Sequence, residues 1–277
     1  MAGVLYLVAT PIGNLEDITY RAARILAEAD LIACEDTRQT RKLLDHLGIH
    51  RPTISYHEHN EAERALELVR RIEDGEHVAL VSDAGAPLIS DPGFRLVREA
   101  LDHGIPVVPI PGPSALLTAL AASGLETDGF CFLGFLPPKG ARRREAIERI
   151  QGTGSTVVLY EAPHRVLATL ADLAEALGDR PVVAAREMTK LHEEFLRGTA
   201  ASIRADLAGR PAVKGEFTLV IGKRPNEAPA GGSDEEIRAA VASLIESGTP
   251  KMDAIRQTAR RFARAKREVY GIVEDAP

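Results

Sequence analysis

The residues best suited to chemistry lie in one run of small residues, at positions 81–93, which reads VSDAGAPLISDPG. The run contains two carboxylates, Asp83 and Asp91, together with two glycines and no lysine. Its glycines let the backbone come close to a ligand, and the missing lysine excludes a phosphate-binding P-loop. Carboxylate and carbonyl oxygens accept hydrogen bonds, so they suit a cationic or amine-bearing ligand. The run therefore predicts a ligand-binding loop.

The segments on either side of this run predict where the loop lies in a fold. Residues 77–81 are apolar and β-branched enough for a buried parallel strand, and residues 94–101 have helical spacing. Open α/β sheets bind ligands at the carboxyl ends of their strands, so the loop is expected at such an edge. A structural alternative is that Asp91 caps the helix, with Pro92 at its first position. That alternative explains Asp91 but not residues 82–85.

A second polar group follows the strand expected at residues 30–34. Two adjacent acids, Glu35 and Asp36, precede two arginines, Arg38 and Arg41. At a strand end these side chains reach the same ligand-binding edge, where a carboxylate is a candidate general base. Alternatively, Asp36 or its neighbour caps the next helix. The two roles are compatible.

Two further strands complete the expected first domain. Residues 4–9 form a strand followed by a turn at 10–15, and residues 105–110 form a strand that ends in a Pro-Gly-Pro-Ser sequence. Strand–turn–helix order favours a doubly wound parallel sheet. Pro113 fits the first turn of an apolar helix at 116–122, so this segment is interpreted either as a cradle of backbone amides or as a hinge between domains.

A second α/β unit begins near residue 124. Strands are expected at 130–136, 155–160 and 181–185, and a strand at 195–199 is expected to pair with one at 215–221. These strands predict a mixed sheet with helices. The loop after the first of them holds a run of cations, which either meets a phosphate backbone or is only solvated surface.

The carboxyl-terminal part is predicted to be helical. Residues 226–233 have the composition of a linker, and helical patterns follow from residue 234. Residues 251–267 carry seven basic side chains and one acid. In a chain of net charge −6, this local excess favours an appendage that faces nucleic acid, although a solvated helix face is an alternative.

Composition and the remaining motifs limit the cellular compartment and the kinds of site that the protein can have. The two cysteines, Cys34 and Cys131, lie far apart in apolar runs, which indicates buried thiols in a reducing compartment. No signal peptide and no membrane-spanning run is evident, so a cytoplasmic protein without membrane contact is expected. His57 and His59 are two residues apart, but they lack metalloprotease spacing and a third cluster, so no metal site is predicted.

Taken together, several motifs resemble one family in order and spacing. The sequence is similar to the tetrapyrrole-methylase superfamily over residues 1–225, and within it to the bacterial small-subunit ribosomal RNA 2′-O-ribose methyltransferases. The motifs that carry the resemblance are TPIGNL at 10–15, ACEDTR at 33–38, VSDAG at 81–85, PGPS at 111–114, YEAPHR at 160–165, REMTK at 186–190 and KGEF at 214–217.

The resemblance implies two α/β domains, 1–112 and 113–225, with S-adenosylmethionine held in the cleft between them, as in class III methyltransferases. It also implies a helical basic extension at 233–277, a homodimer, and methylation of a cytidine 2′-hydroxyl in the decoding region of 16S ribosomal RNA in the small ribosomal subunit. The residues that it places at the cofactor are Pro11, Asp83, Ala84, Gly85, Pro111, Gly112, Pro113, Ser114 and Met188.

Within this reading, Glu35 and Asp36 are the candidate catalytic bases, and alignment of the reactants is expected to supply much of the rate. The residues expected to hold RNA phosphates are Arg38, Arg41, Lys139, Arg142, Arg143 and Arg144. Two alternatives remain open: methylation of a tetrapyrrole or a protein side chain on the same fold, and a non-catalytic RNA-binding assembly factor.

Overall fold

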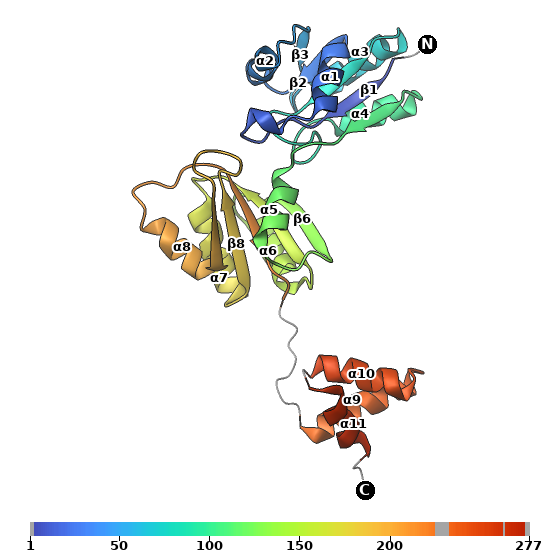
Figure 1. The fold of residues 1–277 in the computed structure, drawn as a ribbon, viewed down its shortest axis with the longest axis vertical. Helices are drawn as coiled ribbons and strands as arrows, with labels where there is room; N and C mark the ends of the chain where they lie inside the picture. The colour runs from blue at the N-terminus through green and yellow to red at the C-terminus, as the bar shows by residue number, and fades with distance from the viewer. Residues whose placement is uncertain (1–2, 225–232, 263, 275–277) are drawn as a thin grey trace. The chain divides into compact units, whose positions relative to one another are not determined.

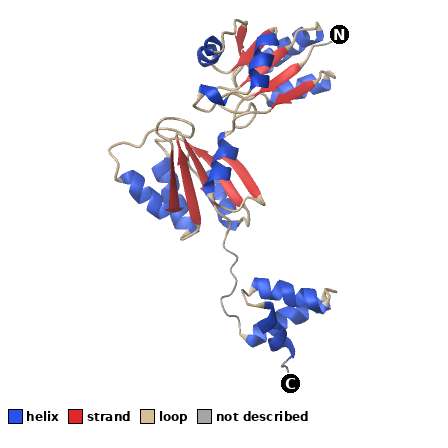
Figure 2. Cartoon of the chain, in the orientation of Figure 1, coloured by secondary structure: helices blue, strands red, loops and turns tan. Residues whose placement is uncertain are grey.

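The computed structural model describes residues 3–224, 233–262 and 264–274. The chain divides into two compact units, Met1–Lys223 and Arg224–Pro277. The first unit contains two five-stranded sheets, and the second unit is helical (Figures 1 and 2).

The first sheet is entirely parallel and has the strand order β3-β2-β4-β1-β5. Its strands are short and apolar because helices cover both faces of the sheet. Leu80 packs with residues of α3 and α4, whereas its neighbours Ala79 and Val81 pack with residues of α1 and α2. The elements are β1 (Leu5–Val8), η1 (Leu15–Asp17), α1 (Tyr20–Glu28), β2 (Leu31–Cys34), α2 (Thr37–His46), β3 (Thr53–Ser55), α3 (Glu61–Glu73), β4 (Val78–Val81), α4 (Phe94–Asp102) and β5 (Val107–Ile110).

Strands β1 and β4 lie side by side, but the helices that follow them pack on opposite faces of the sheet. The two chain directions therefore diverge after these strands, which is the topological switch point where α/β sheets bind ligands. The loops that leave the two strands are joined by reciprocal backbone hydrogen bonds between Thr10 and Gly85, at 2.9 and 3.0 Å.

The second sheet is mixed and has the order β6-β7-β10-β8-β9; only β6 and β7 are parallel. Alternate side chains of β7 face different layers: Leu159 packs with α7 and α8, and Val158 packs with α5. The elements are α5 (Ala115–Ser123), β6 (Phe130–Phe135), α6 (Ala141–Gly152), β7 (Thr156–Glu161), α7 (Val166–Leu177), β8 (Pro181–Arg186), β9 (Glu194–Thr199), α8 (Ala200–Ala208) and β10 (Phe217–Ile221).

Two local predictions for this region were wrong. Strand β9 pairs with β8 and not with β10, because a short connection makes β8 and β9 an antiparallel neighbour pair and β10 inserts on the other edge of β8. Pro113 lies before α5 and not in its first turn, since Ser114 is the N-cap.

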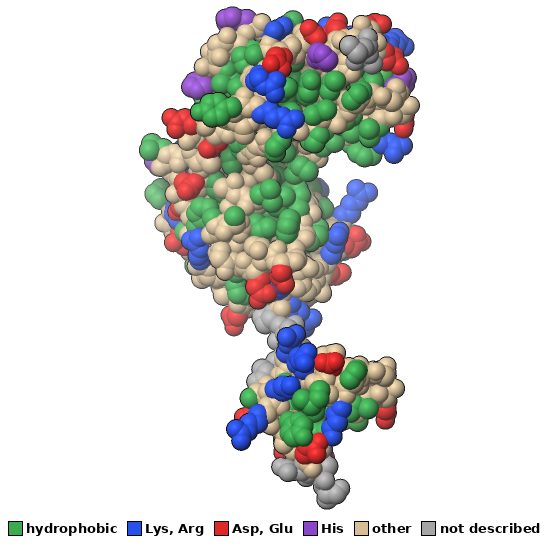
Figure 3. Space-filling model, turned by 45° about the vertical axis from the view of Figure 1, so that its right-hand side comes forward, with side chains coloured by type: hydrophobic (Ala, Val, Ile, Leu, Met, Phe, Trp, Pro, Cys, Tyr) green, Lys and Arg blue, Asp and Glu red, His purple; other side chains and the backbone are tan. Residues whose placement is uncertain are grey.

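The second unit contains α9 (Asp234–Glu246), α10 (Lys251–Arg261) and α11 (Lys266–Glu274), as the sequence predicted. The helices share an apolar core that includes Ile237, Ile255 and Val269. The predicted linker at 226–233 lies almost wholly outside the described residues. Figure 3 shows several lysine and arginine side chains on the viewed face of this unit. Among the helices that the structure describes, none is long and apolar enough to cross a membrane.

Candidate functional site

Two adjoining pockets lie at the loops of the first unit. The first, of about 300 Å³, is here called the apolar pocket; it is lined by Ile12, Ala84, Ile89, Ser90, Asp91, Ala115, Phe135, Tyr160, Glu161, Ala162, Pro163, Met188, Glu216, Phe217 and Thr218. The second, of about 450 Å³, is called the polar pocket; it is lined by Thr10, Pro11, Ile12, Gly13, Leu15, Gln39, Thr40, Lys42, Leu43, Ser82, Asp83, Ala84, Lys190 and Glu216. Three residues, Ile12, Ala84 and Glu216, line both.

The loop between β4 and α4 is held in shape by its own polar groups. Ser82 Oγ donates to Asp91 Oδ2 at 2.8 Å, and Ala84 N–H donates to Ser82 Oγ at 3.2 Å. Thr10 Oγ1 donates to the Ser82 carbonyl at 3.0 Å. The alternative that Asp91 caps α4 is wrong, because Gly93 is the N-cap and no side chain caps it. Asp91 instead closes the loop.

Strained backbone lies on both sides of the apolar pocket. Leu88 and Ser90 in the β4–α4 loop have φ angles of 70° and 68°, and Glu187 and Thr189, which flank Met188, have φ angles of 51° and 67°. These are the only non-glycine residues with positive φ in the described parts of the chain. Such strain concentrates where a ligand must be held, so its position supports the pocket as a binding site.

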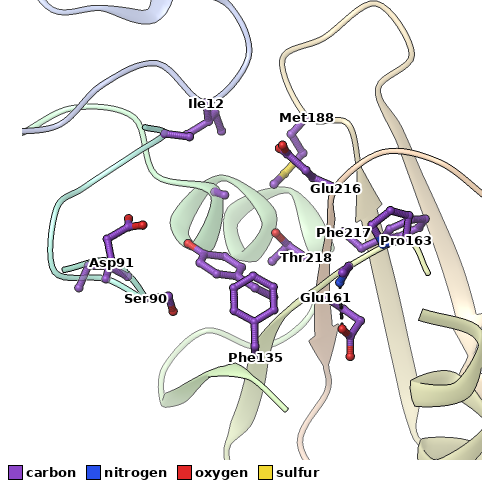
Figure 4. A pocket seen from close by; sticks show the side chains of 15 residues that line it. Ile12, Ser90, Asp91, Phe135, Glu161, Pro163, Met188, Glu216, Phe217 and Thr218 are labelled. Carbon is purple, nitrogen blue, oxygen red and sulfur yellow. Dashed lines mark hydrogen bonds between the residues drawn. The ribbon is translucent and has the colours of Figure 1, made fainter. Parts of the chain in front are cut away.

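The second sheet supplies the aromatic wall of the apolar pocket. Tyr160 packs edge-on against Phe132 and Phe135, with ring centroids 4.8 and 5.8 Å apart, and its hydroxyl accepts from the Leu116 N–H at 3.2 Å. Desolvation raises the pKa of Tyr160, so this group stays protonated at neutral pH. Figure 4 shows Met188 and Glu216 across the pocket from Asp91.

A cationic side chain closes the corner between the two sheets. Lys190 Nζ donates to Glu187 Oε1 at 3.0 Å and to Glu216 Oε2 at 3.1 Å. The stem of Lys190 lies over Gly13, where an added Cβ would come within 2.6 Å of its Cγ. Desolvation of Lys190 is outweighed by the hydrogen bonds to Glu187 and Glu216, so its pKa is raised. The β1 loop is thereby fixed against the second sheet.

Acidic side chains gather at the carboxyl edge of the first sheet. Desolvation, reinforced by the charges of Asp83, Asp91 and Glu58, raises the pKa of Glu35. Desolvation also raises the pKa of Asp83 and of Asp91. The Glu35 side chain is exposed and forms no hydrogen bond or ion pair with any described residue. A carboxylate of this kind is a proton acceptor of increased basicity.

The pKa of Asp36 is shifted in the opposite direction from that of Glu35. It is the N-cap of α2, accepting from the Arg38 N–H at 2.8 Å, and it also pairs with the Arg38 guanidinium at 2.7 Å. The side-chain and backbone hydrogen bonds from Arg38 lower the pKa of Asp36 to about 2. Its own N–H donates to Asp83 Oδ1 at 3.1 Å, so Asp36 orients the acidic edge and is a poor base.

The predicted cofactor residues converge only in part. Ala84 and Met188 line the apolar pocket, and Pro11, Asp83 and Ala84 line the polar pocket. Gly85 faces Ile12 and the Pro113 carbonyl, at 3.5 and 3.8 Å from an added Cβ. Pro111, Gly112, Pro113 and Ser114 line neither pocket, but they lead into Ala115, which lines the apolar one.

Sequence reasoning did not select Ile12, Tyr160, Lys190 or Glu216. Tyr160 is the last residue of the strand predicted at 155–160. Lys190 belongs to the REMTK motif, which follows the strand predicted at 181–185. That position at a strand end was the available signal, as it was for Glu35.

The prediction that Arg143 binds RNA phosphates was wrong. Arg143 is buried: it donates to Asp172 at 2.8 Å, to Thr169 Oγ1 at 3.0 Å and to the Pro137 carbonyl at 3.1 Å, so it does not present a cation to RNA. Its guanidinium anchors the loop to α7. In contrast, four predicted cations are exposed and form no side-chain hydrogen bond or ion pair with described residues: Arg41, Lys139, Arg142 and Arg144. Arg38 is also exposed, but it is paired with Asp36.

The histidine pair noted in the sequence, His57 and His59, belongs to no metal-binding cluster among the described residues. His57 and His59 lie with ring centroids 5.9 Å apart. Within the described residues no group of three or more His, Cys, Asp or Glu side chains is arranged to hold a metal ion. Both cysteines are free; Cys34 is buried as predicted, whereas Cys131 is only partly buried.

Comparison with known proteins places this geometry in a family. The family described as Tetrapyrrole (Corrin/Porphyrin) Methylases matches residues 4–204. The protein named Ribosomal RNA small subunit methyltransferase I from Halalkalibacterium halodurans is 48% identical over 98% of this chain and 94% of its own length. The protein of that name from Bacillus subtilis is 43% identical, over 97% of this chain and 93% of its own length.

Solved structures share the fold. Diphthine synthase matches with a TM-score of 0.62 and 16% identity, over 79% of this chain and 90% of its own. Uroporphyrin-III C-methyltransferase from Thermus thermophilus, solved with S-adenosylhomocysteine, matches with a TM-score of 0.56 and 21% identity, over 79% of this chain and 97% of its own. These matches confirm the expected class III methyltransferase-like fold. The chain therefore belongs to the tetrapyrrole methylase family and is a methyltransferase of the same type as its curated relatives.

Proposed function

We propose that this protein uses S-adenosylmethionine to methylate the 2′-hydroxyl of a cytidine ribose in the decoding region of 16S ribosomal RNA. The names of relatives up to 48% identical over nearly the whole chain support an RNA of the small ribosomal subunit as the substrate. The cytidine, the 2′-oxygen and the decoding region come from the motif resemblance. The observation that carries the chemistry is Glu35, a carboxylate of raised pKa with no partner among the described residues. It lines neither pocket, but it interacts electrostatically with Asp83 of the polar pocket and with Asp91 of the apolar pocket.

The residues of the apolar pocket fit the cofactor. Ile12, Tyr160 and Met188 offer an apolar slot for adenine, and a volume of about 300 Å³ is at the low end for small-molecule sites. Asp91 provides a carboxylate that can accept from an amino group. A relative of the same fold was solved with S-adenosylhomocysteine. When bound, S-adenosylmethionine supplies an electrophilic methyl group on a positively charged sulfur, a charge that the neighbouring carboxylates favour.

The chain's own part in the reaction is alignment and proton removal. Glu35 would accept the proton of the ribose 2′-hydroxyl while the ribose oxygen takes the methyl group. The bond between that methyl group and the sulfur would break, which leaves S-adenosylhomocysteine. Its raised pKa brings it nearer to the working pH than an ordinary carboxylate. Asp36 holds Asp83 through its N–H and carries no proton itself. Most of the rate should come from alignment of the two reactants.

Cations outside the pockets would hold the RNA. Lys139, Arg142, Arg144 and Arg41 are exposed and unpaired among the described residues. In the helical unit Lys251 pairs with Glu274 and Arg256 with Asp253, while Arg260, Arg264, Lys266 and Arg267 make no ion pair with described residues. Unpaired cations of this kind bind phosphates and release counterions. We place the enzyme on the small ribosomal subunit, as a homodimer, in the cytoplasm.

The test is to incubate the protein with methyl-labelled S-adenosylmethionine and small ribosomal subunits from cells that lack this gene, and to digest the RNA to nucleosides. Label in 2′-O-methylcytidine is the expected result. Label in added tetrapyrrole or in protein, with none in RNA, would assign the fold to another substrate. Absence of cofactor binding would favour a non-catalytic assembly factor.

A further inference from the structure

We infer that the polar pocket receives the target nucleoside, turned out of its stack, while the cofactor occupies the apolar pocket. This inference rests on the proposed function and assigns a second site within it. No predicted cofactor or RNA-binding role covered Gln39, Thr40 or Lys42, which the structure places in the wall of the polar pocket.

The position of the acidic edge decides which pocket takes the nucleoside. Glu35 lines neither pocket, but the helix that follows it, α2, lines only the polar pocket. The N–H of the next residue, Asp36, donates to Asp83, which also lines only the polar pocket. We therefore expect a hydroxyl that loses its proton to Glu35 to approach from the polar side. Ile12, Ala84 and Glu216 line both pockets, so ligands in the two pockets would lie next to each other.

The chemistry of the wall suits a pyrimidine edge. Lys42 Nζ donates to Gln39 Oε1 at 3.0 Å, which fixes the Gln39 carbonyl and leaves its amide N–H groups available. Amide and ammonium donors complement the ring nitrogen and carbonyl acceptors of a base. Leu15 and Leu43 lie in the same wall and can contact a base face.

One wall residue has a hydroxyl that the protein itself does not satisfy. Thr40 is 5% exposed, lines the polar pocket, and its Oγ1 has no hydrogen-bond partner among the described residues. The Cys34 thiol is close enough to interact with Thr40: desolvation raises the pKa of Cys34, and Thr40 lowers it. A thiol is only a weak acceptor. A buried unsatisfied hydroxyl is costly, so a ligand group is expected to pair with it.

The size of the pocket limits the form of the substrate. A space of about 450 Å³ accommodates one nucleoside but not a duplex, so the target must be single-stranded or flipped out of its helix. Enzymes that act on a nucleotide commonly take it out of the stack, and specific RNA recognition favours unstacked bases.

The test compares Gln39→Ala/Lys42→Ala with Asp45→Ala, an exposed residue on the same helix that lines neither pocket. All three substituted positions are exposed, so each protein should fold. We expect the double variant to raise the KM for small ribosomal subunits about 10-fold or more, as for loss of base-edge hydrogen bonds. The affinity for S-adenosylmethionine, measured by equilibrium dialysis, should stay within twofold. The single variant Gln39→Ala should raise KM without changing its salt dependence, since no charge is lost.

The outcomes separate the two proposals. If the wild-type protein labels no RNA, the proposed function fails, and the nucleoside assignment fails with it. If the wild type labels RNA and the double variant keeps its KM within twofold, only the nucleoside assignment is wrong. An equal rise in KM for Asp45→Ala, or a matching loss of cofactor affinity in the double variant, would also overturn it.

Discussion

The two sheets of the first unit differ in whether their carboxylates are paired with cations. On the first sheet, desolvation raises the pKa of Glu35, Asp83 and Asp91, and no cation pairs with them among the described residues. On the second sheet, hydrogen bonds from Arg210 and Arg186 lower the pKa of Glu194, even though desolvation opposes them. Buried Glu161 accepts from Thr169 at 2.6 Å.

The difference separates a reactive edge from a supporting one. Unpaired carboxylates cost stability, so a protein keeps them where they serve binding or chemistry. Paired charges fix loops in place and leave little reactivity. The same residue types therefore have different uses on the two sheets.

The largest effect is expected at the reactive edge. Glu35→Gln should lower the single-turnover methylation rate by about 10²–10⁴-fold, because it removes the proton acceptor and keeps the shape. The matched control is Asp36→Asn, which should cost less than about 10-fold, since a carboxylate of pKa about 2 is a poor base. Equal losses in the two variants would show that both carboxylates act only in positioning.

Breaking a paired charge of the second α/β layer, that of Arg143, should lower the stability of the fold. Arg143→Ala leaves Asp172 without its partner and removes one of the two side-chain hydrogen bonds of Thr169, so we expect a loss of about 2 kcal/mol in the free energy of unfolding. The estimate stays below the range for fully buried pairs because the Asp172 side chain is 41% exposed. Urea unfolding checks it. Arg142→Ala, an exposed neighbour, should change stability by no more than about 0.5 kcal/mol; equal losses would refute the anchoring role.

RNA affinity should show the reverse order for these arginines in the first turn of α6. Arg142→Glu or Arg144→Glu is expected to weaken binding of small subunits several-fold and to reduce the slope of log affinity against log salt by about 1 per lost phosphate contact. Filter binding at several salt concentrations measures both. An unchanged affinity and slope would show that the start of α6 is not part of the RNA interface.

The smallest expected effect is a gain in folding stability on substitution of Asp83. Asp83→Asn keeps the oxygen that accepts from the Asp36 N–H and removes a charge that the fold disfavours. The folded-state pKa of Asp83 is raised, so the gain in stability is present at neutral pH and disappears as the pH falls below the pKa of the unfolded chain. We expect less than about 1 kcal/mol, because the side chain is exposed. A loss of stability at pH 7 would contradict the unpaired charge.

Much of the framework could be predicted from the sequence because it depends on local pattern. Apolar β-branched runs predicted the parallel strands. The loops at the carboxyl ends of these strands indicated Glu35, Asp83 and the role of Asp36 as a helix cap. Long-range arrangement could not be predicted this way. Arg143 looks the same as Arg142 and Arg144 in sequence, and only the packing of α6 on α7 buries it.

The same limit applies to the pockets and to the second sheet. Tyr160 lines a pocket together with Ser90 and Asp91, and Lys190 lies over Gly13. These residues are far apart along the chain, so spacing alone did not select Tyr160 or Lys190. The order of β8, β9 and β10 depends on which antiparallel pairing the short connections allow.

The most direct test of the unpaired edge is the pH dependence of single-turnover methylation by the wild type and Glu35→Gln, with labelled S-adenosylmethionine and small ribosomal subunits. The wild-type rate should fall as the pH drops through a pKa above the ordinary Glu value of 4.5, because protonated Glu35 accepts no proton. The Glu35→Gln variant should be slow and lack this acid limb. The same limb in both proteins, or a wild-type rate that is flat over this range, would contradict the assignment of Glu35 as the base.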